Sequence, residues 1–147
     1  MKKLILVAVL TILFNIILYI VSTQLLAHMS VLIFVLLIYL APLIINGILT
    51  LLMRHQNLEK STIISATFFP TISIITYWLL GNALDGTKKW MSFVAKNSVS
   101  TGDTYVKINP HLTSISQMIF VIILYFSIEF LLLTIIKKLR GTHHENN

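Results

Sequence analysis

The chain has 147 residues, of which 56% are hydrophobic and only 11% are charged, and its mean hydropathy is +0.88. A soluble domain carries about 25% charged residues, so this composition excludes a water-covered globule and predicts a surface covered by the lipid bilayer. Eleven Lys and Arg against five Asp and Glu give a net charge of +6, which in a membrane protein reports orientation and contact with anionic headgroups. No basic stripe with interleaved aromatic residues accompanies this excess, so nucleic acid is not a predicted partner.

Four apolar stretches are long enough to cross a membrane, since a helix needs roughly 20 apolar residues to span about 30 Å of hydrocarbon. None of them alternates as the strands of a transmembrane barrel do. The sequence therefore predicts an all-α, polytopic integral membrane protein, a single membrane domain over residues 1–147 with four transmembrane helices. The predicted helices cover about residues 4–26, 31–53, 62–83 and 112–136.

The distribution of Lys and Arg predicts that both termini are cytoplasmic. The terminal side would hold Lys2, Lys3, Arg54, Lys60, Lys137, Lys138 and Arg140, and the opposite side Lys88, Lys89, Lys96 and Lys107. Cytoplasmic loops carry an excess of Lys and Arg, and the turn at residues 27–30 has no fixed charge, as expected outside the cell. The richness in Ile, Lys and Asn suits an AT-rich bacterial genome, so we expect a bacterial cytoplasmic membrane.

The one long connection, about residues 84–111, is predicted to be extracellular. It opens with the turn signal Asp85-Gly86. Residues 98–110 are rich in Ser, Thr, Gly, Asp and Asn, and we expect them to form a mobile loop.

Within this connection, residues 88–96 form a short amphipathic stretch. Trp90 and Phe93 lie three residues apart, on one helical face between lysines, which is typical of a helix lying at the headgroup boundary. The alternative is an ordinary solvated loop in which Trp78 and Trp90 act as interfacial anchors. The sequence leaves both interpretations open.

Glu129 is the most informative residue, because a carboxylate inside hydrocarbon either finds partners or takes up a proton. Counted from the charged helix ends at 1.5 Å per residue, Glu129 lies about 12 Å deep, Asn46 about 10 Å and Thr67 at a similar level, with Asn15 about 18 Å deep. This intramembrane polar cluster predicts a neutral Glu129 that is hydrogen-bonded to Asn46 and holds two helices together. The alternative is a proton- or cation-responsive site on a pathway.

The second helix contains Pro42, Asn46 and Gly47 within six positions. Proline frees a carbonyl one turn back and glycine allows close helix approach, so a local kink is predicted there. Broken helices of this kind occur in transporter binding sites and in ordinary membrane bundles. The ordinary bundle is favoured, since only Pro70 offers a rough counterpart in another helix.

The sequence shows no set of residues typical of an enzyme. Its five histidines fall at helix ends and in the C-terminal tail, and no H-E-x-x-H, G-x-S-x-G, P-loop or dinucleotide motif is present. The chain has no cysteine, which excludes disulfides and thiolate metal sites. We predict no catalytic residues, no metal site and no cofactor.

Several further features occur together at the two ends and in the second helix. The chain starts MKKLIL, residues 42–49 read PLIINGIL, a long connection precedes the fourth helix, and that helix ends in Lys137-Lys138. In these features the chain resembles the staphylococcal-type Msa family of small four-helix membrane proteins. The resemblance implies a non-enzymatic membrane protein that influences virulence-regulator expression or envelope signalling, and it carries over no catalytic residues.

The predicted function is therefore that of a regulatory or accessory modulator acting through protein or lipid contacts. Its expected partners are the lipid bilayer and another membrane protein or a second copy of the chain. The alternative is a small transporter, immunity or pore-forming subunit that uses the level of Asn46 and Glu129.

Overall fold

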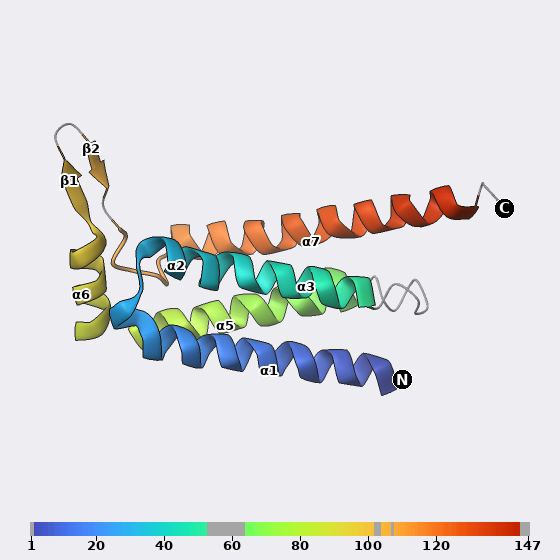
Figure 1. The fold of residues 1–147 in the computed structure, drawn as a ribbon, viewed down its shortest axis with the longest axis horizontal. Helices are drawn as coiled ribbons and strands as arrows, with labels where there is room; N and C mark the ends of the chain where they lie inside the picture. The colour runs from blue at the N-terminus through green and yellow to red at the C-terminus, as the bar shows by residue number, and fades with distance from the viewer. Residues whose placement is uncertain (1, 53–63, 102–103, 107, 145–147) are drawn as a thin grey trace.

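The computed structural model describes residues 2–52, 64–101, 104–106 and 108–144 (Figure 1). In this part of the chain, four helical segments are long and apolar enough to cross a membrane, and they run side by side as a bundle. The prediction of an all-α polytopic fold is confirmed. The four segments are Ile5–His28, Val31–Leu52, Ser65–Leu84 and Ile115–Ile136.

The first and last spans are formed by α1 (Lys2–Leu25), with the 3₁₀ turn η1 (Leu26–His28) after it, and by α7 (Ile115–His144). The start of α1 and the end of α7 lie at the same end of the bundle (Figure 1), here called the terminal end. The opposite end is the loop end. The helix α7 continues beyond the predicted boundary at residue 136, and the first four residues after this boundary, two Lys, a Leu and an Arg, are good helix formers.

Each of the two middle spans contains a π-helical turn before a proline. The second span consists of α2 (Val31–Val35), η2 (Leu36–Leu40) and α3 (Ala41–Leu52), and the third of η3 (Ile64–Phe68) and α5 (Phe69–Leu84). Proline has no N–H for the regular ladder, and wider turns accommodate such breaks. The irregularity predicted at Pro42 thus takes the form of a π turn, and Pro70 is preceded by another one.

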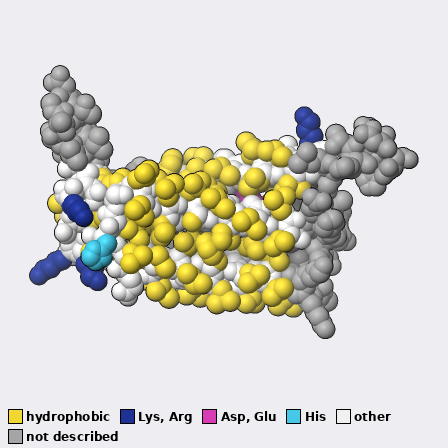
Figure 2. Space-filling view, in the orientation of Figure 1, with side chains coloured by type: hydrophobic (Ala, Val, Ile, Leu, Met, Phe, Trp, Pro, Cys, Tyr) yellow, Lys and Arg dark blue, Asp and Glu magenta, His cyan; other side chains and the backbone are white. Residues whose placement is uncertain are grey.

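Apolar side chains cover the outside of the bundle between its two ends (Figure 2). Large hydrophobic residues are exposed on every span, among them Leu13, Leu32, Ile44, Ile75, Ile123 and Phe130. Contiguous apolar surface of this extent does not occur on monomeric soluble proteins. It fits the hydrocarbon of a bilayer, and the described Lys side chains lie at the two ends (Figure 2).

At the loop end, α6 (Lys88–Asn97) lies across the bundle (Figure 1). Trp90 is fully buried and Phe93 is 3% exposed, and both rings pack on Phe34 of α2 at centroid distances of 5.3 and 5.1 Å. The indole Nε1 of Trp90 donates to the carbonyl of Pro110 at 2.6 Å. The Trp90 and Phe93 rings therefore cover the end of the bundle, and the predicted anchoring of α6 at the headgroup boundary remains a prediction.

The segment predicted as a mobile loop contains a β-hairpin. The strands β1 (Val99–Thr101) and β2 (Thr104–Val106) pair antiparallel, with Val99 opposite Val106. Their Val, Thr and Tyr residues are good strand formers, a signal that the small polar residues of the segment obscured in the sequence.

A turn and a close helix contact fasten the third span to the start of the fourth. Gly86 has a φ of 74°, a conformation that glycine adopts without strain, as the predicted Asp85-Gly86 turn requires. The carboxylate of Asp85 accepts hydrogen bonds from the backbone N–H groups of Leu112 and Thr113 at 2.9 and 3.2 Å, and from the Thr113 hydroxyl at 2.7 Å. A Cβ atom at Gly81 would lie 2.6 Å from Thr113 Cγ2, so only glycine allows this approach.

Candidate functional site

Glu129 is buried in the bundle, with 1% of its surface exposed. Its Oε1 accepts a hydrogen bond of 2.8 Å from the hydroxyl of Thr50 on α3. The carboxyl group does bind the second span, but the partner is Thr50, one turn beyond the predicted Asn46. Its other oxygen, Oε2, has no hydrogen-bond partner among the described residues.

Asn46 joins α3 to α5 instead. Its side-chain N–H group donates to the hydroxyl of Ser73 at 3.2 Å, and the residue is buried. Its Oδ1 finds no partner in the described part of the chain. The predicted Asn46–Glu129 bond is thus replaced by two bonds on successive turns of α3, one to each neighbouring helix.

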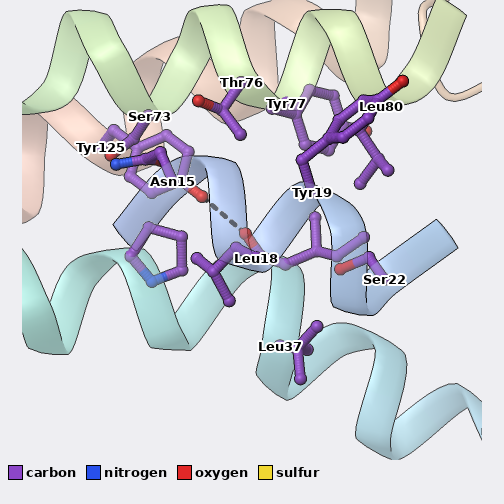
Figure 3. Close-up of a pocket in the computed structure, with 12 residues that line it drawn as sticks. Asn15, Leu18, Tyr19, Ser22, Leu37, Ser73, Thr76, Tyr77, Leu80 and Tyr125 are labelled. Carbon is purple, nitrogen blue, oxygen red and sulfur yellow. Dashed lines mark hydrogen bonds between the residues drawn. The ribbon is translucent and has the colours of Figure 1, made fainter. Parts of the chain in front are cut away.

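Asn15 lines a small pocket near the middle of the bundle, here called the central pocket (Figure 3). Its volume is about 20 Å³. The amide of Asn15 donates to the Thr11 carbonyl of its own helix at 2.8 Å, which leaves its buried Oδ1 without a described partner. Further polar side chains around the pocket come from α1, α5 and α7, namely Tyr19, Ser22, Ser73, Thr76, Tyr77 and Tyr125. Ser73 therefore connects the pocket to Asn46.

Pro42 creates a second link between spans. In a regular helix its N–H would bond to the carbonyl of Ile38, and proline has none. The hydroxyl of Tyr125 on α7 donates to this carbonyl at 2.6 Å (Figure 3). The proline break is thus satisfied from another helix, as is common in membrane bundles.

A third polar group lies between the central pocket and the loop end. Gln117 donates to the hydroxyl of Tyr39 at 2.6 Å, and the hydroxyls of Tyr39 and Tyr77 are 3.3 Å apart. The hydroxyl of Tyr77 also donates to the carbonyl of Leu112 at 3.1 Å. Since Tyr77 lines the central pocket as well, the polar groups run from the start of α7 to the bundle centre.

A wider groove of about 110 Å³ opens at the loop end, between α2, α6 and the start of α7. Tyr39 and Gln117 line its floor together with Phe34, and Asn109 and His111 stand at its exposed side. The hydroxyl network therefore connects the groove to the central pocket.

The remaining predicted residues lie outside these groups. Thr67 is an exposed residue of η3, and Trp78 is 49% exposed on α5. A Cβ atom at Gly47 would lie 3.4 Å from Leu132 Cδ1 on α7, which is ordinary packing. The predicted anchoring role of Trp78 remains a prediction.

No group of three or more His, Cys, Asp or Glu side chains comes together within the described residues. The candidate site is therefore a set of hydroxyl, amide and carboxyl groups. It suits hydrogen bonding, water binding and proton binding.

Sequence reasoning missed Thr50, Ser73 and the tyrosine hydroxyls. A signal was present for Thr50, which lies four residues after Asn46 and hence on the same helix face. Ser73 was one of many Ser and Thr residues in its span, and no sequence feature distinguished it from the others.

The chain matches no protein-family model, no curated protein and no solved structure. The geometry of the site is therefore the basis for a function.

Proposed function

We propose that this chain is a non-enzymatic, multi-pass protein of the bacterial cytoplasmic membrane, acting as a regulatory or accessory modulator through protein or lipid contacts. Its output is of the kind that the Msa-like sequence features imply, an effect on virulence-regulator expression or envelope signalling. Its termini face the cytoplasm, and α6 and the hairpin face outward, in line with the distribution of Lys and Arg.

The observation that carries the proposal is the use of the buried polar side chains to join helices. Such interhelical hydrogen bonds hold membrane bundles together. The pocket between them has a volume of about 20 Å³, close to that of a single water site. This interior supports a fixed scaffold better than a conduit for a solute. The bonds are Thr50 to Glu129, Asn46 to Ser73, and Tyr125 to the Ile38 carbonyl.

The outward face of α6 is the surface we assign to a partner. Trp90 and Phe93, the apolar face of α6, are buried against the bundle, whereas Lys88, Lys89 and Lys96 are exposed. Clustered lysines beside a membrane attract anionic headgroups and acidic protein surfaces. We therefore assign the contact with the partner to the lysine-bearing face of α6.

The test compares two charge-removing variants in cells that lack the native copy. Replacing Lys88, Lys89 and Lys96 with Gln should abolish the regulatory effect on gene expression and the cross-linking of a defined membrane partner. Lys138→Gln removes an exposed lysine of the other end and should leave both unchanged. Equal activity of the two variants would show that the lysines of α6 are not the contact surface.

The transport alternative rests on one specific observation, the buried Glu129 oxygen without a described partner. Proteoliposomes of the purified chain should show no solute flux or ionic current above the lipid background. A solute flux that Glu129→Gln abolishes would favour the transporter or pore-forming subunit and overturn the scaffold.

A further inference from the structure

Two buried acceptor oxygens on facing helices have no hydrogen-bond donor among the described residues. They are Asn46 Oδ1 on α3 and Glu129 Oε2 on α7. The 2.8 Å bond from Thr50, one turn after Asn46, holds the Glu129 carboxyl against this face of α3. Buried acceptors need donors, and a proton on Oε2 would convert that atom from an acceptor into a donor.

No described cation offers Glu129 an alternative to protonation. In the described parts of α3, η3 and α5, which pack against α7, the one titratable side chain is Tyr77. The helix α7 adds Tyr125 and, at least eight residues beyond Glu129 in the last turns of the helix, Lys137, Lys138, Arg140, His143 and His144, of which Lys138 is exposed; η2 adds Tyr39. A charged carboxylate would therefore stand in a low-dielectric interior beside neutral groups, where its neutral form is favoured.

The central pocket provides a site for a water molecule. Its volume of about 20 Å³ exceeds the about 10–15 Å³ that one water requires, and a buried water needs two to four polar partners. Asn15, which is 3% exposed, lines the pocket with an unpartnered Oδ1. The Ser73 hydroxyl accepts from Asn46, so its own proton remains free to bind water.

We propose that Glu129 binds a proton within the membrane and exchanges it with the loop-end side through a water held in the central pocket. The proton leaves a hydronium ion in the loop-end groove, which becomes water, and ends as the O–H of Glu129 Oε2. One O–H bond breaks and one forms, and the carboxylate loses its negative charge. The Gln117–Tyr39–Tyr77 network lines the way from the groove to the pocket, and Ser73 and Asn46 line the way from the pocket toward Glu129.

Infrared spectroscopy of the full chain in lipid nanodiscs tests the proton site. The wild-type protein should show the carbonyl stretch of a protonated carboxyl group at neutral pH, and transfer to D₂O should shift it to lower frequency. Glu129→Gln should lose this band. Labelling of the wild-type chain with ¹³C-glutamate should shift the same band, which assigns it to a glutamate, and the Glu129→Gln variant then separates Glu129 from Glu59 and Glu145. A wild-type spectrum without this band, or a band that the label leaves in place, would overturn the proposal.

The rate of the deuterium shift tests the path. Asn15→Leu removes a partner of the water and fills the pocket, so exchange should slow by roughly two- to tenfold, the factor for one neutral hydrogen bond. Ser73→Ala, which breaks the link to Asn46, provides a second variant should the first fail to fold. Thr134→Val is the matched control, because Thr134 is exposed and its hydroxyl donates to the Phe130 carbonyl of its own helix. Exchange as fast in the pocket variants as in this control would exclude the central pocket as the route.

Discussion

Gly81 tests whether the close contact between the third and fourth spans fixes the bundle. A Cβ atom there would lie 2.6 Å from Thr113 Cγ2 and 3.3 Å from Leu112 Cβ. The Thr113 side chain cannot turn away freely, because its hydroxyl donates to Asp85 at 2.7 Å. Gly81→Ala must therefore separate the helices or break this hydrogen bond.

The magnitude follows from three contributions. Overpacking of a filled contact costs about 1–3 kcal/mol, and a broken hydrogen bond to a charged group costs about 1.5–3 kcal/mol. Alanine regains about 1 kcal/mol of helix propensity over glycine. Since the first two costs are alternatives and the helix-propensity gain offsets about 1 kcal/mol of either, Gly81→Ala should lower the free energy of unfolding by up to about 2 kcal/mol.

The measurement is SDS-induced unfolding in mixed micelles, followed by circular dichroism. Gly47→Ala is the matched control, because its Cβ would lie 3.4 Å from the flexible end of Leu132 and should leave stability unchanged or slightly higher. Thr113→Ser removes Cγ2 and keeps the hydroxyl, so it should restore stability in the Gly81→Ala background. Equal stability of the two alanine variants would refute the steric reasoning.

Two further predictions concern the proline link and the topology. Tyr125→Phe should lower stability by about 0.6–1.7 kcal/mol, the range for interhelical hydrogen bonds in membranes, and by less when Pro42→Ala restores a backbone donor to the same carbonyl. An equal loss of unfolding free energy in both backgrounds, measured by the same assay, would show that the Tyr125 hydrogen bond does not depend on Pro42. Single cysteines at Ser98 and Thr142 in this cysteine-free chain should react with an impermeant thiol reagent in intact cells at position 98 only. Labelling at position 142 alone would reverse the orientation.

The fold was predictable to the extent that it depends on the lengths of apolar runs. Four runs of the required length predicted four spans, and an even number places the ends of α1 and α7 together (Figure 1). Lipid solvates every apolar face equally well, so hydrophobicity alone does not say which face of a span meets its neighbours. The burial of Trp90 illustrates this limit, since its surroundings come from Phe34 and Pro110, far away in the sequence.

The depth of the candidate site residues in the membrane was predictable from the sequence, but the direction of each side chain around its helix axis was not. Counting residues from helix ends placed Asn46, Thr67 and Glu129 at one level, and Glu129 does bind this part of the second span. Thr67 is exposed on the π turn η3, whereas Ser73 on α5 is buried and binds Asn46. The bond to Thr50 in place of Asn46 reflects an error of one turn, because charged residues at helix ends do not mark a common plane.

The polar side chains of this bundle determine how the helices are rotated against one another, which the hydrophobic effect cannot do between helices in lipid. Between lipid-solvated helices, packing and hydrogen bonds select one rotation over another. Glu129 and Tyr125 lie four residues apart on α7 and therefore share a face, and they bind α3 and η2 respectively. The second span can accept both bonds because Pro42 releases the carbonyl of Ile38, about two turns before Asn46, and Thr50 offers a hydroxyl one turn after Asn46. The proline thus determines how the second span faces the fourth, and its replacement should loosen the pairing that holds Glu129 in place.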